Sequence, residues 1–488
     1  MANSIMFQGT GSDVGKTVLV AGLCRLASNR GIKVLPFKPQ NMSNNAAVAD
    51  DGGEIGRGQW LQAVASRATP SIHMNPVLLK PQSETGSQIV LHGKVWGQAR
   101  AQDYRTIRLQ LLDGVLESFD TLSKQADLIL VEGAGSPAEI NLRAGDIANM
   151  GFATAANVPV ALVGDIDRGG VIASLVGTHT ILPQADRDMI KAYLINKFRG
   201  DVSLFDDGLE AIKSFTGWTS LGIVPWLEAA KRLPAEDSVV LERLAGGIDG
   251  NFKIVVPKIP RIANFDDFDP LTAEPSLDVE FIDPKDPIPD DTKLVILPGS
   301  KSTVSDLKCL IEHGWREKLQ RHIGAGHSVL GVCGGFQMLG RKIFDPEHIE
   351  GQEEDVDGLG LLDIETVMEP LKITQNLTAR SDLFDAQING YEIHIGRTTG
   401  PDCARAFCYV GEKADGAVST DGKIMGTYMH RLFDADEFRQ AFFKSLGADV
   451  SDINYHQLID DTLDEIADQL DRYLDFDAIL SIAAKAGR

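Results

Sequence analysis

The chain has 488 residues, with 47 Lys and Arg against 69 Asp and Glu, which gives a formal net charge of −22. A surface this acidic repels phosphate backbones and anionic lipids, so we exclude nucleic acids and membrane surfaces as partners. The few cysteines are scattered without a CxxC pair, which is not typical of a disulfide framework or a zinc site. No apolar run approaches the ~20 residues that span a bilayer, and we expect a cytoplasmic protein.

Short apolar runs alternate with amphipathic stretches through the first half of the chain. These runs predict strands at residues 4–9, 33–38, 128–135, 158–166 and 192–197. Most of them end in Gly, Asp or Asn or are followed by one of these residues. The stretches 17–31 and 108–125 have apolar residues at helical spacing. This alternation predicts βαβ units, with a parallel sheet covered by helices on both faces.

A second α/β series follows a charged, helix-like stretch at residues 225–251. Its predicted strands lie at residues 252–259, 294–300, 328–335 and 423–430. The Pro- and Asp-rich segment 266–291 is predicted as loop, and the last ~40 residues as helix. We therefore expect an α/β fold with two doubly wound parallel-sheet domains, 1–235 and 250–445, and a helical tail at 446–488.

The first predicted strand leads into the glycine-rich loop GTGSDVGKT and then into a helix. Glycines let backbone N–H groups approach phosphates, and the helix N-terminus favours their charge. A lysine and a hydroxyl residue at the end of such a loop bind phosphate oxygens and Mg²⁺. The spacing is one residue longer than GxxxxGK[ST], so this is a variant phosphate loop. We predict that Gly11, Gly15, Lys16 and Thr17 bind ATP.

Acidic residues near strand ends are the candidate ligands for Mg²⁺. Glu132 ends an apolar run, at the edge of the sheet where open α/β folds bind ligands. Asp51 or Glu54, in an acidic glycine-rich turn, completes the predicted metal site, although a solvated turn explains them equally well. We predict Mg²⁺ ligands at Thr17, Asp51 and Glu132. Lys38, also after a predicted strand, is expected in the phosphate or carboxylate region.

Cys333 lies at a sharp turn between a predicted strand and helix, in the sequence GVCGGFQ. A helix N-terminus favours a thiolate, and the N–H of Gly334 is placed to stabilise an oxyanion beside that sulfur. A thiolate nucleophile needs a general base, for which His430 after a later strand is the candidate, with His394 as a competitor. The turn at Gly299 and Ser300 offers a second oxyanion N–H.

These motifs together resemble known families. The Cys333 elbow with His430 resembles a class I, triad-type glutamine amidotransferase domain, and the phosphate loop resembles dethiobiotin synthetase. In this order the two halves resemble the cobyric acid synthase family over nearly the whole chain. The matching strings include FKPQNMSNNAAV, DGGEIGRGQ, NPVLLKPQSETGSQIVLHG, EGAGSPAEINL, DIDRGGVIASLVGT, INKFRGD, IANFDDFDPL, PGSKSTVSDL and GYEIHIGRT.

The resemblance implies amidation of the b, d, e and g carboxylates of adenosylcobyrinic acid a,c-diamide, using glutamine, ATP and Mg²⁺. ATP converts each carboxylate to an acyl phosphate, since a carboxylate oxygen is a poor leaving group. Cys333 attacks the glutamine amide, His430 moves the proton, and Gly334 with the Gly299–Ser300 turn holds the oxyanion. Gln337 is expected to contact the bound glutamine.

The sequence departs from the triad pattern at one position. Triad amidotransferases usually carry Glu two residues after the histidine, where this chain has Leu432. Leucine cannot orient an imidazole by hydrogen bonding. Either another acid takes this role, with Glu392 as the candidate, or the site works as a Cys/His dyad.

A polycarboxylate substrate needs local positive charge on so acidic a chain. Candidates near predicted strand ends are Arg57, Lys80, Arg168, Lys197 and Arg199, and a solvated surface position explains each equally well. Two rival functions stay open: the a,c-diamide synthase of the same pathway, and a non-catalytic ATP switch with a vestigial amidotransferase module. The sequence leaves the oligomeric state open.

Overall fold

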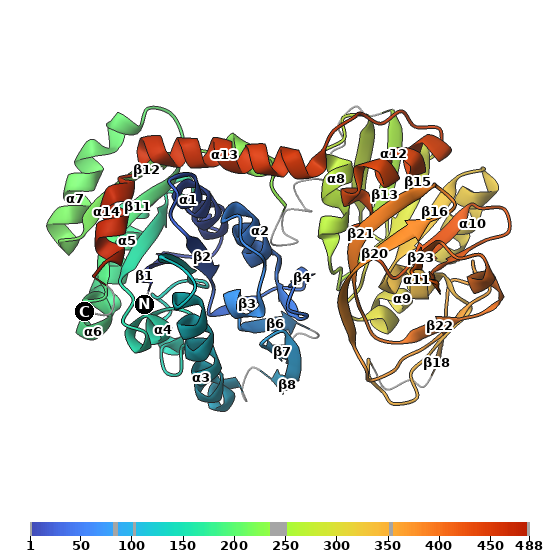
Figure 1. The fold of residues 1–488 in the computed structure, drawn as a ribbon, viewed down its shortest axis with the longest axis horizontal. Helices are drawn as coiled ribbons and strands as arrows, with labels where there is room; N and C mark the ends of the chain where they lie inside the picture. The colour runs from blue at the N-terminus through green and yellow to red at the C-terminus, as the bar shows by residue number, and fades with distance from the viewer. Residues whose placement is uncertain (1, 82–85, 101–103, 235–250, 351–354, 486–488) are drawn as a thin grey trace. The chain divides into compact units, whose positions relative to one another are not determined.

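The computed structural model describes residues 2–81, 86–100, 104–234, 251–350 and 355–485. The chain divides into two units (Figure 1). Unit 1 consists of Met1–Ser43, Ala49–Glu236 and Ile459–Arg488, and unit 2 of Asn44–Val48 and Asp237–Leu458. Within the described ranges, no helix combines the length and the apolar character needed to cross a membrane.

The main sheet of unit 1 is parallel, with the strand order β12-β11-β10-β1-β9-β2. Its strands are β1 (Asn3–Gly9), β2 (Val34–Phe37), β9 (Leu128–Glu132), β10 (Val160–Asp165), β11 (Ile190–Phe198) and β12 (Thr219–Pro225). The apolar runs of the first half thus form parallel strands, as predicted, and their carboxyl ends lie at one edge of the sheet.

Helices cover this sheet, and a smaller sheet of order β3-β6-β7-β8 accompanies it (Figure 1). Before its C-terminal segment, unit 1 has the helices α1 (Lys16–Asn29), α2 (Arg57–Ala65), α3 (Tyr104–Ser123), α4 (Met150–Ala155), α5 (Val171–Ile181), α6 (Gln184–Arg187) and α7 (Asp206–Thr216). The further strands are β3 (Gln40–Met42), β5 (Glu54–Gly56), β6 (Val77–Pro81), β7 (Gly86–Leu91) and β8 (Lys94–Arg100). The short 3-10 helices are η1 (Ile72–Met74), η2 (Ile140–Leu142), η3 (Val202–Phe205) and η4 (Glu228–Arg232).

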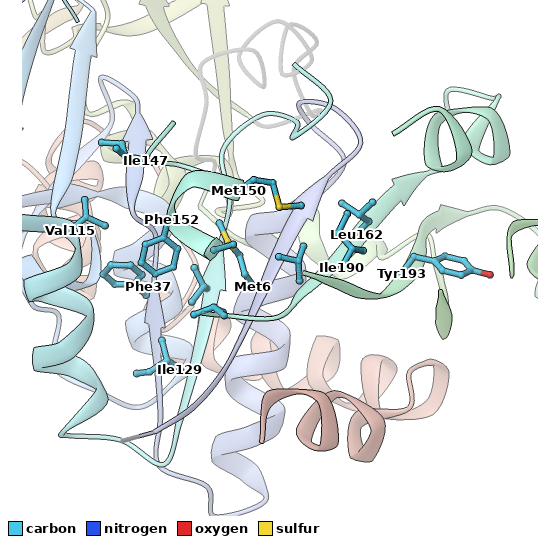
Figure 2. Close-up of a cluster of buried hydrophobic side chains, with 14 of the residues drawn as sticks. Met6, Phe37, Val115, Ile129, Ile147, Met150, Phe152, Leu162, Ile190 and Tyr193 are labelled. Atoms are coloured by element: carbon cyan, nitrogen blue, oxygen red, sulfur yellow. The ribbon is translucent and has the colours of Figure 1, made fainter. Parts of the chain in front are cut away.

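The core of unit 1 lies between the sheet and its helices. Figure 2 shows Phe37 of β2 beside Phe152 of α4, with Ile129 and Met6 from the neighbouring strands. The rings of Phe37 and Phe152 are 5.3 Å apart between centroids. Burial of such large apolar side chains fixes the strands and therefore the loops at their carboxyl ends.

The main sheet of unit 2 has the order β14-β13-β15-β16-β26-β25 and is parallel except for β25. Its strands are β13 (Phe252–Pro257), β14 (Leu277–Ile282), β15 (Thr292–Leu297), β16 (Ser328–Val332), β25 (Ala417–Val418) and β26 (Ile424–Thr427). The prediction that 266–291 is loop was wrong. Leu277, Val279 and Phe281 alternate with polar residues and form the edge strand β14, and η6 (Phe265–Phe268) and α8 (Asp269–Thr272) precede it.

Two smaller sheets complete unit 2, with the orders β18-β17-β19-β22 and β21-β20-β23-β24. Their strands are β17 (Lys342–Phe344), β18 (Asp355–Asp357), β19 (Glu365–Val367), β20 (Ile373–Ser381), β21 (Ala386–His394), β22 (Arg397–Thr399), β23 (Cys408–Val410) and β24 (Lys413–Asp415). The remaining elements are β4 (Ala46–Val48), α9 (Thr303–Glu312), α10 (Trp315–Gly324), α11 (Gly334–Leu339), α12 (Asp436–Ser445), η7 (Pro401–Ala404) and η8 (Leu432–Asp434).

The tail is helical, as predicted, and forms α13 (Tyr455–Tyr473) and α14 (Phe476–Ala483). From Ile459 onward it belongs to unit 1. Arg25 of α1, whose side chain is fully buried, pairs with Asp460 and Asp464 of α13. The charged stretch at 225–251 contributes η4, and residues 235–250 lie outside the described part of the chain.

Candidate active sites

The phosphate loop lies between β1 and α1. Gly15 has φ 90°, a left-handed conformation that favours glycine, and a Cβ there would lie 2.5 Å from Nδ2 of Asn196. Lys16 begins α1, and its Nζ donates to the carbonyl oxygens of Gly11 at 3.2 Å and Gly135 at 3.3 Å. The lysine ammonium therefore lies over the loop, where it can contact phosphate oxygens.

Glu132, at the end of β9, is the centre of a hydrogen-bond network beside this loop. Its Oε1 accepts from Thr17 Oγ1 at 2.8 Å and from Lys38 Nζ at 2.9 Å. Its Oε2 accepts from Gln62 Nε2 at 2.6 Å and from Gln59 Nε2 at 3.5 Å. Sequence reasoning missed both glutamines. Their signal was the i, i+3 spacing on one face of α2, with Gln59 as the last residue of the string DGGEIGRGQ.

The donor atoms next to the phosphate loop fit a magnesium ion. The hydroxyl of Thr17 and the carboxylate of Glu132 are oxygen ligands of the kind that Mg²⁺ prefers, and nucleotide sites use few protein carboxylates. Asp51 is engaged elsewhere: its carboxylate accepts from Ser71 Oγ at 2.6 Å and from the N–H of Ile72 at 3.0 Å. Its role as a metal ligand stays a prediction.

The basic residues predicted to bind a polycarboxylate have acidic or aromatic partners. Lys80 and Glu54 form a buried pair at 2.7 Å, so the alternative ligand Glu54 is already paired. The guanidinium of Arg57 stacks 4.1 Å from the ring centroid of Trp60. The other pairs are Arg168–Asp13 at 3.3 Å, Lys197–Asp165 at 2.9 Å and Arg199–Asp167 at 2.6 Å. Substrate contacts by these residues stay a prediction.

In unit 2, Cys333 lies between β16 and α11 with φ 53° and ψ −108°. This left-handed φ is strained for a residue with a side chain and is typical of a nucleophile turn. A Cβ on Gly331 would lie 2.6 Å from the carbonyl oxygen of Gly335, and one on Gly335 only 2.1 Å from that of Leu297. The turn therefore requires its glycines. The sulfur of Cys333 donates to the carbonyl oxygen of Ile393 at 3.5 Å.

The two predicted oxyanion donors lie next to one another. A Cβ on Gly334 would lie 2.9 Å from the backbone nitrogen of Ser300. The hydroxyl of Ser300 donates to Asp306 at 2.6 Å, and Asp306 also accepts from the N–H of Arg261. Burial raises the pKa of Asp306 to about 6, although these hydrogen bonds oppose the rise. The assignment of these two backbone N–H groups to an oxyanion hole stays a prediction.

His430, three residues after β26, is held by a carboxylate. Its Nδ1 lies 2.7 Å from Oδ2 of Asp267, and Oδ1 of the same carboxylate accepts from the N–H of Arg431 at 2.6 Å. The ring of Tyr391 stacks on the imidazole, with centroids 5.2 Å apart. Burial disfavours the charged ring, yet the charges of Asp267 and Cys333 raise the pKa of His430 well above its ordinary value.

The orienting acid is therefore Asp267, and the candidate Glu392 was wrong. Glu392 accepts a hydrogen bond from Gln375 Nε2 at 2.9 Å, in the sheet formed by β20 and β21. Leu432 is buried and contributes no polar group. Asp267 lies in η6, within the segment that the sequence predicted as loop. Its only signal was the string IANFDDFDPL.

Gln337 lies one helical turn after Cys333. Its Nε2 donates to the carbonyl oxygen of Ile395 at 2.8 Å and to Tyr428 Oη at 3.2 Å, and its Oε1 accepts from Thr303 at 3.3 Å. These contacts fix the amide beside the nucleophile. The competing base His394 stacks on Tyr428, whereas His430 is the imidazole held by the carboxylate of Asp267.

The family comparisons agree on both halves. A CobQ/CobB/MinD/ParA nucleotide-binding domain matches residues 5–240, and a CobB/CobQ-like glutamine amidotransferase domain matches residues 253–438. The chain is 62% identical over 483 residues to the cobyric acid synthase of Brucella suis biovar 1 (strain 1330), covering 99% of this chain and 100% of that protein. It is equally identical, over 482 residues and with the same coverage, to the cobyric acid synthase of Brucella anthropi. The chain belongs to the cobyric acid synthase family.

Proposed function

We propose that this enzyme amidates the b, d, e and g carboxylates of adenosylcobyrinic acid a,c-diamide to give adenosylcobyric acid in cobalamin biosynthesis. It uses ATP to activate each carboxylate and glutamine to supply the nitrogen. The proposal depends on one observation: a single chain contains two complete sets of reactive groups. One set is the phosphate loop with Glu132, and the other is the array Cys333, His430 and Asp267.

The glutaminase steps follow from the array in unit 2. The sulfur of Cys333 attacks the side-chain carbonyl carbon of glutamine, and the N–H groups of Gly334 and Ser300, next to Gly299, stabilise the oxyanion. His430, oriented by Asp267, gives its proton to the leaving nitrogen, so that ammonia departs and a thioester remains. Water then hydrolyses the thioester to glutamate. Gln337 supplies a fixed amide that binds the substrate glutamine.

The synthetase steps use the phosphate loop of unit 1. Gly11, Gly15, Lys16 and Thr17 bind the phosphates of ATP, and Lys38 binds the γ-phosphate or the acceptor carboxylate. The carboxylate takes the γ-phosphoryl group to become an acyl phosphate, which ammonia then attacks, releasing phosphate. We assign Thr17, Asp51 and Glu132 as the groups that hold Mg²⁺. When bound, the ion neutralises charge on the phosphate oxygens.

We assign the ATP-dependent half to residues 1–235, the glutaminase half to 250–445 and a helical tail to 446–488. The matched family ranges, 5–240 and 253–438, support these limits. The partners are small molecules: the corrin polycarboxylate, glutamine and ATP, with no nucleic acid and no membrane. We place the enzyme in the cytoplasm.

A mass-spectrometric time course tests the reaction. Purified protein is mixed with adenosylcobyrinic acid a,c-diamide, ATP, Mg²⁺ and glutamine, and we expect successive products that end at the hexaamide. Turnover of cobyrinic acid without its a and c amides, in place of the diamide, would assign the chain to the a,c-diamide synthase reaction. No turnover of either corrin would contradict the enzymatic proposal and favour an ATP switch.

Two nitrogen sources, glutamine and ammonium salts, test the two halves of the enzyme separately. Cys333→Ala abolishes amidation with glutamine and leaves amidation with ammonium salts, because external ammonia bypasses the thioester. Lys16→Ala abolishes amidation from both sources, because no acyl phosphate forms. Loss of ammonia-dependent activity in Cys333→Ala would refute the division of labour between the halves.

A further inference from the structure

His394 is the last residue of β21, and the backbone next to it contacts the nucleophile Cys333. The residue before it, Ile393, accepts a hydrogen bond from the sulfur of Cys333 at 3.5 Å. The residue after it, Ile395, accepts one from Nε2 of Gln337 at 2.8 Å. The backbone on either side of His394 therefore contacts the nucleophile and the amide proposed to bind glutamine.

The ring of His394 has a fixed orientation. It lies flat on the ring of Tyr428, with centroids 3.7 Å apart and an interplanar angle of 16°. The hydroxyl of Tyr428 bonds Gln337 Nε2 at 3.2 Å and Thr398 Oγ1 at 2.5 Å. This network fixes the ring of Tyr428 and with it the imidazole that stacks on it.

A buried nitrogen of this ring lacks a partner. His394 is 9% exposed, and among the described residues nothing forms a hydrogen bond with its Nδ1. A buried polar atom left unpaired costs free energy, and in native proteins such an atom calls for a ligand or a function. Burial and the charge of His430 lower the pKa of His394 to about 4, so the ring is neutral at physiological pH. A neutral imidazole has one nitrogen with a free lone pair.

We propose that Nδ1 of His394 accepts a hydrogen bond from the amide nitrogen of glutamine as that nitrogen leaves the tetrahedral intermediate as ammonia. This inference rests on the proposed glutaminase function. In this step the carbon–nitrogen bond of the tetrahedral intermediate breaks, its electron pair stays on nitrogen, and Nε2–H of His430 supplies the proton. His394 transfers no proton. It orients the leaving NH₂ group and holds neutral NH₃, the form that can attack an acyl phosphate.

The test compares two leaving groups in the full-length enzyme. The leaving group of glutamine is ammonia, whereas that of the γ-methyl ester of glutamate is methanol. The departing oxygen of methanol carries no N–H group. His394→Phe keeps a flat ring on Tyr428 and removes both nitrogens. We expect kcat for glutamine to fall about tenfold, the effect of about one hydrogen bond, with KM little changed. Hydrolysis of the ester keeps its rate.

Two further variants test which ring nitrogen of His394 accepts the hydrogen bond. His394→Asn places a polar atom near the position of Nδ1 and restores glutamine hydrolysis, whereas His394→Gln places it near Nε2 and does not. The control is His322→Phe. His322 is also buried with a pKa lowered to about 4, but its Nε2 bonds the carbonyl of Ser328 at 3.0 Å outside the site. His322→Phe should leave the ratio of the glutamine rate to the ester rate unchanged.

The outcomes separate this inference from the function on which it rests. Equal loss of amide and ester hydrolysis in His394→Phe would overturn the inference and leave the glutaminase intact as a proposal. Rescue by Gln as good as rescue by Asn would overturn the assignment to Nδ1. Failure of the unmodified enzyme to hydrolyse either substrate would instead refute the proposed function.

Discussion

Oδ2 of Asp267 lies 2.7 Å from Nδ1 of His430, although 163 residues separate them in the sequence. The second oxygen of this carboxylate accepts from the N–H of Arg431, which fixes its orientation. A buried carboxylate at Nδ1 selects the tautomer of a catalytic imidazole and stabilises its protonated form. The acid that holds His430 therefore comes from η6, whereas Leu432 occupies the position where the triad pattern has its acid.

Replacement of this carboxylate tests its role. Asp267→Asn keeps the shape but removes the charge and the defined acceptor for Nδ1–H, so glutamine-dependent amidation should fall by about 10²–10⁴-fold. Ammonia-dependent amidation should be unchanged, and both are measured as product per unit time on one preparation. Glu392→Gln is the matched control and should keep its glutamine-dependent rate. If the two variants lose equal activity, Asp267 is not the orienting acid.

The sequence predicts what local patterns determine. The parallel strands follow from short apolar runs, and the phosphate loop and the Cys333 turn follow from glycines at positions where a Cβ would clash. Asp267 could not be predicted, because its position depends on packing between segments far apart in the chain. Its neighbourhood looks like loop, since Asp and Pro are frequent there. Gln59 and Gln62 were missed for the same reason: only the folded sheet brings them to Glu132.

The oxyanion turn is packed so closely that one methyl group disturbs it. A Cβ on Gly334 would lie 2.9 Å from the backbone nitrogen of Ser300 and 3.1 Å from its Cβ. Gly334→Ala should therefore displace a predicted oxyanion donor and lower kcat for glutamine by about 10²-fold. The control is Gly324→Ala in α10, where a Cβ meets nothing within 4 Å. Equal rates in both variants would mean that this N–H pair does not stabilise the oxyanion.

Asp306 makes the stability of the enzyme depend on pH. Its pKa is raised from 3.8 to about 6 by burial, so the folded state binds a proton that the unfolded state releases. The stability that this proton provides is complete below pH 3.8 and is lost as the pH rises through about 6. Asp306→Asn has no charge to bury at any pH.

The prediction concerns the difference between two free energies of unfolding, that of Asp306→Asn minus that of the unmodified enzyme. This difference should increase by about 1 kcal/mol between pH 5 and 7. Above pH 7 the difference should stay level. Urea unfolding at several pH values measures it. The hydrogen bonds lost from Ser300 and Arg261 lower the difference by a constant amount, so only its slope with pH is decisive. A difference that does not vary with pH would contradict an elevated pKa.

The C-terminal helices stabilise the helix that begins at the phosphate loop. A Cβ on Gly22 of α1 would lie 2.6 Å from both Ile466 Cγ2 and Leu470 Cδ1 of α13. Gly22→Val should thus separate α13 from α1 and reduce the free energy of unfolding by about 2 kcal/mol, as overpacking does. Because α1 carries Lys16 at its first turn, KM for ATP should rise as well. The control is Gly177→Ala in α5, where a Cβ meets nothing within 4 Å and helix propensity favours alanine. If thermal unfolding midpoints show Gly22→Val to be as stable as this control, the tail does not pack on α1 as described.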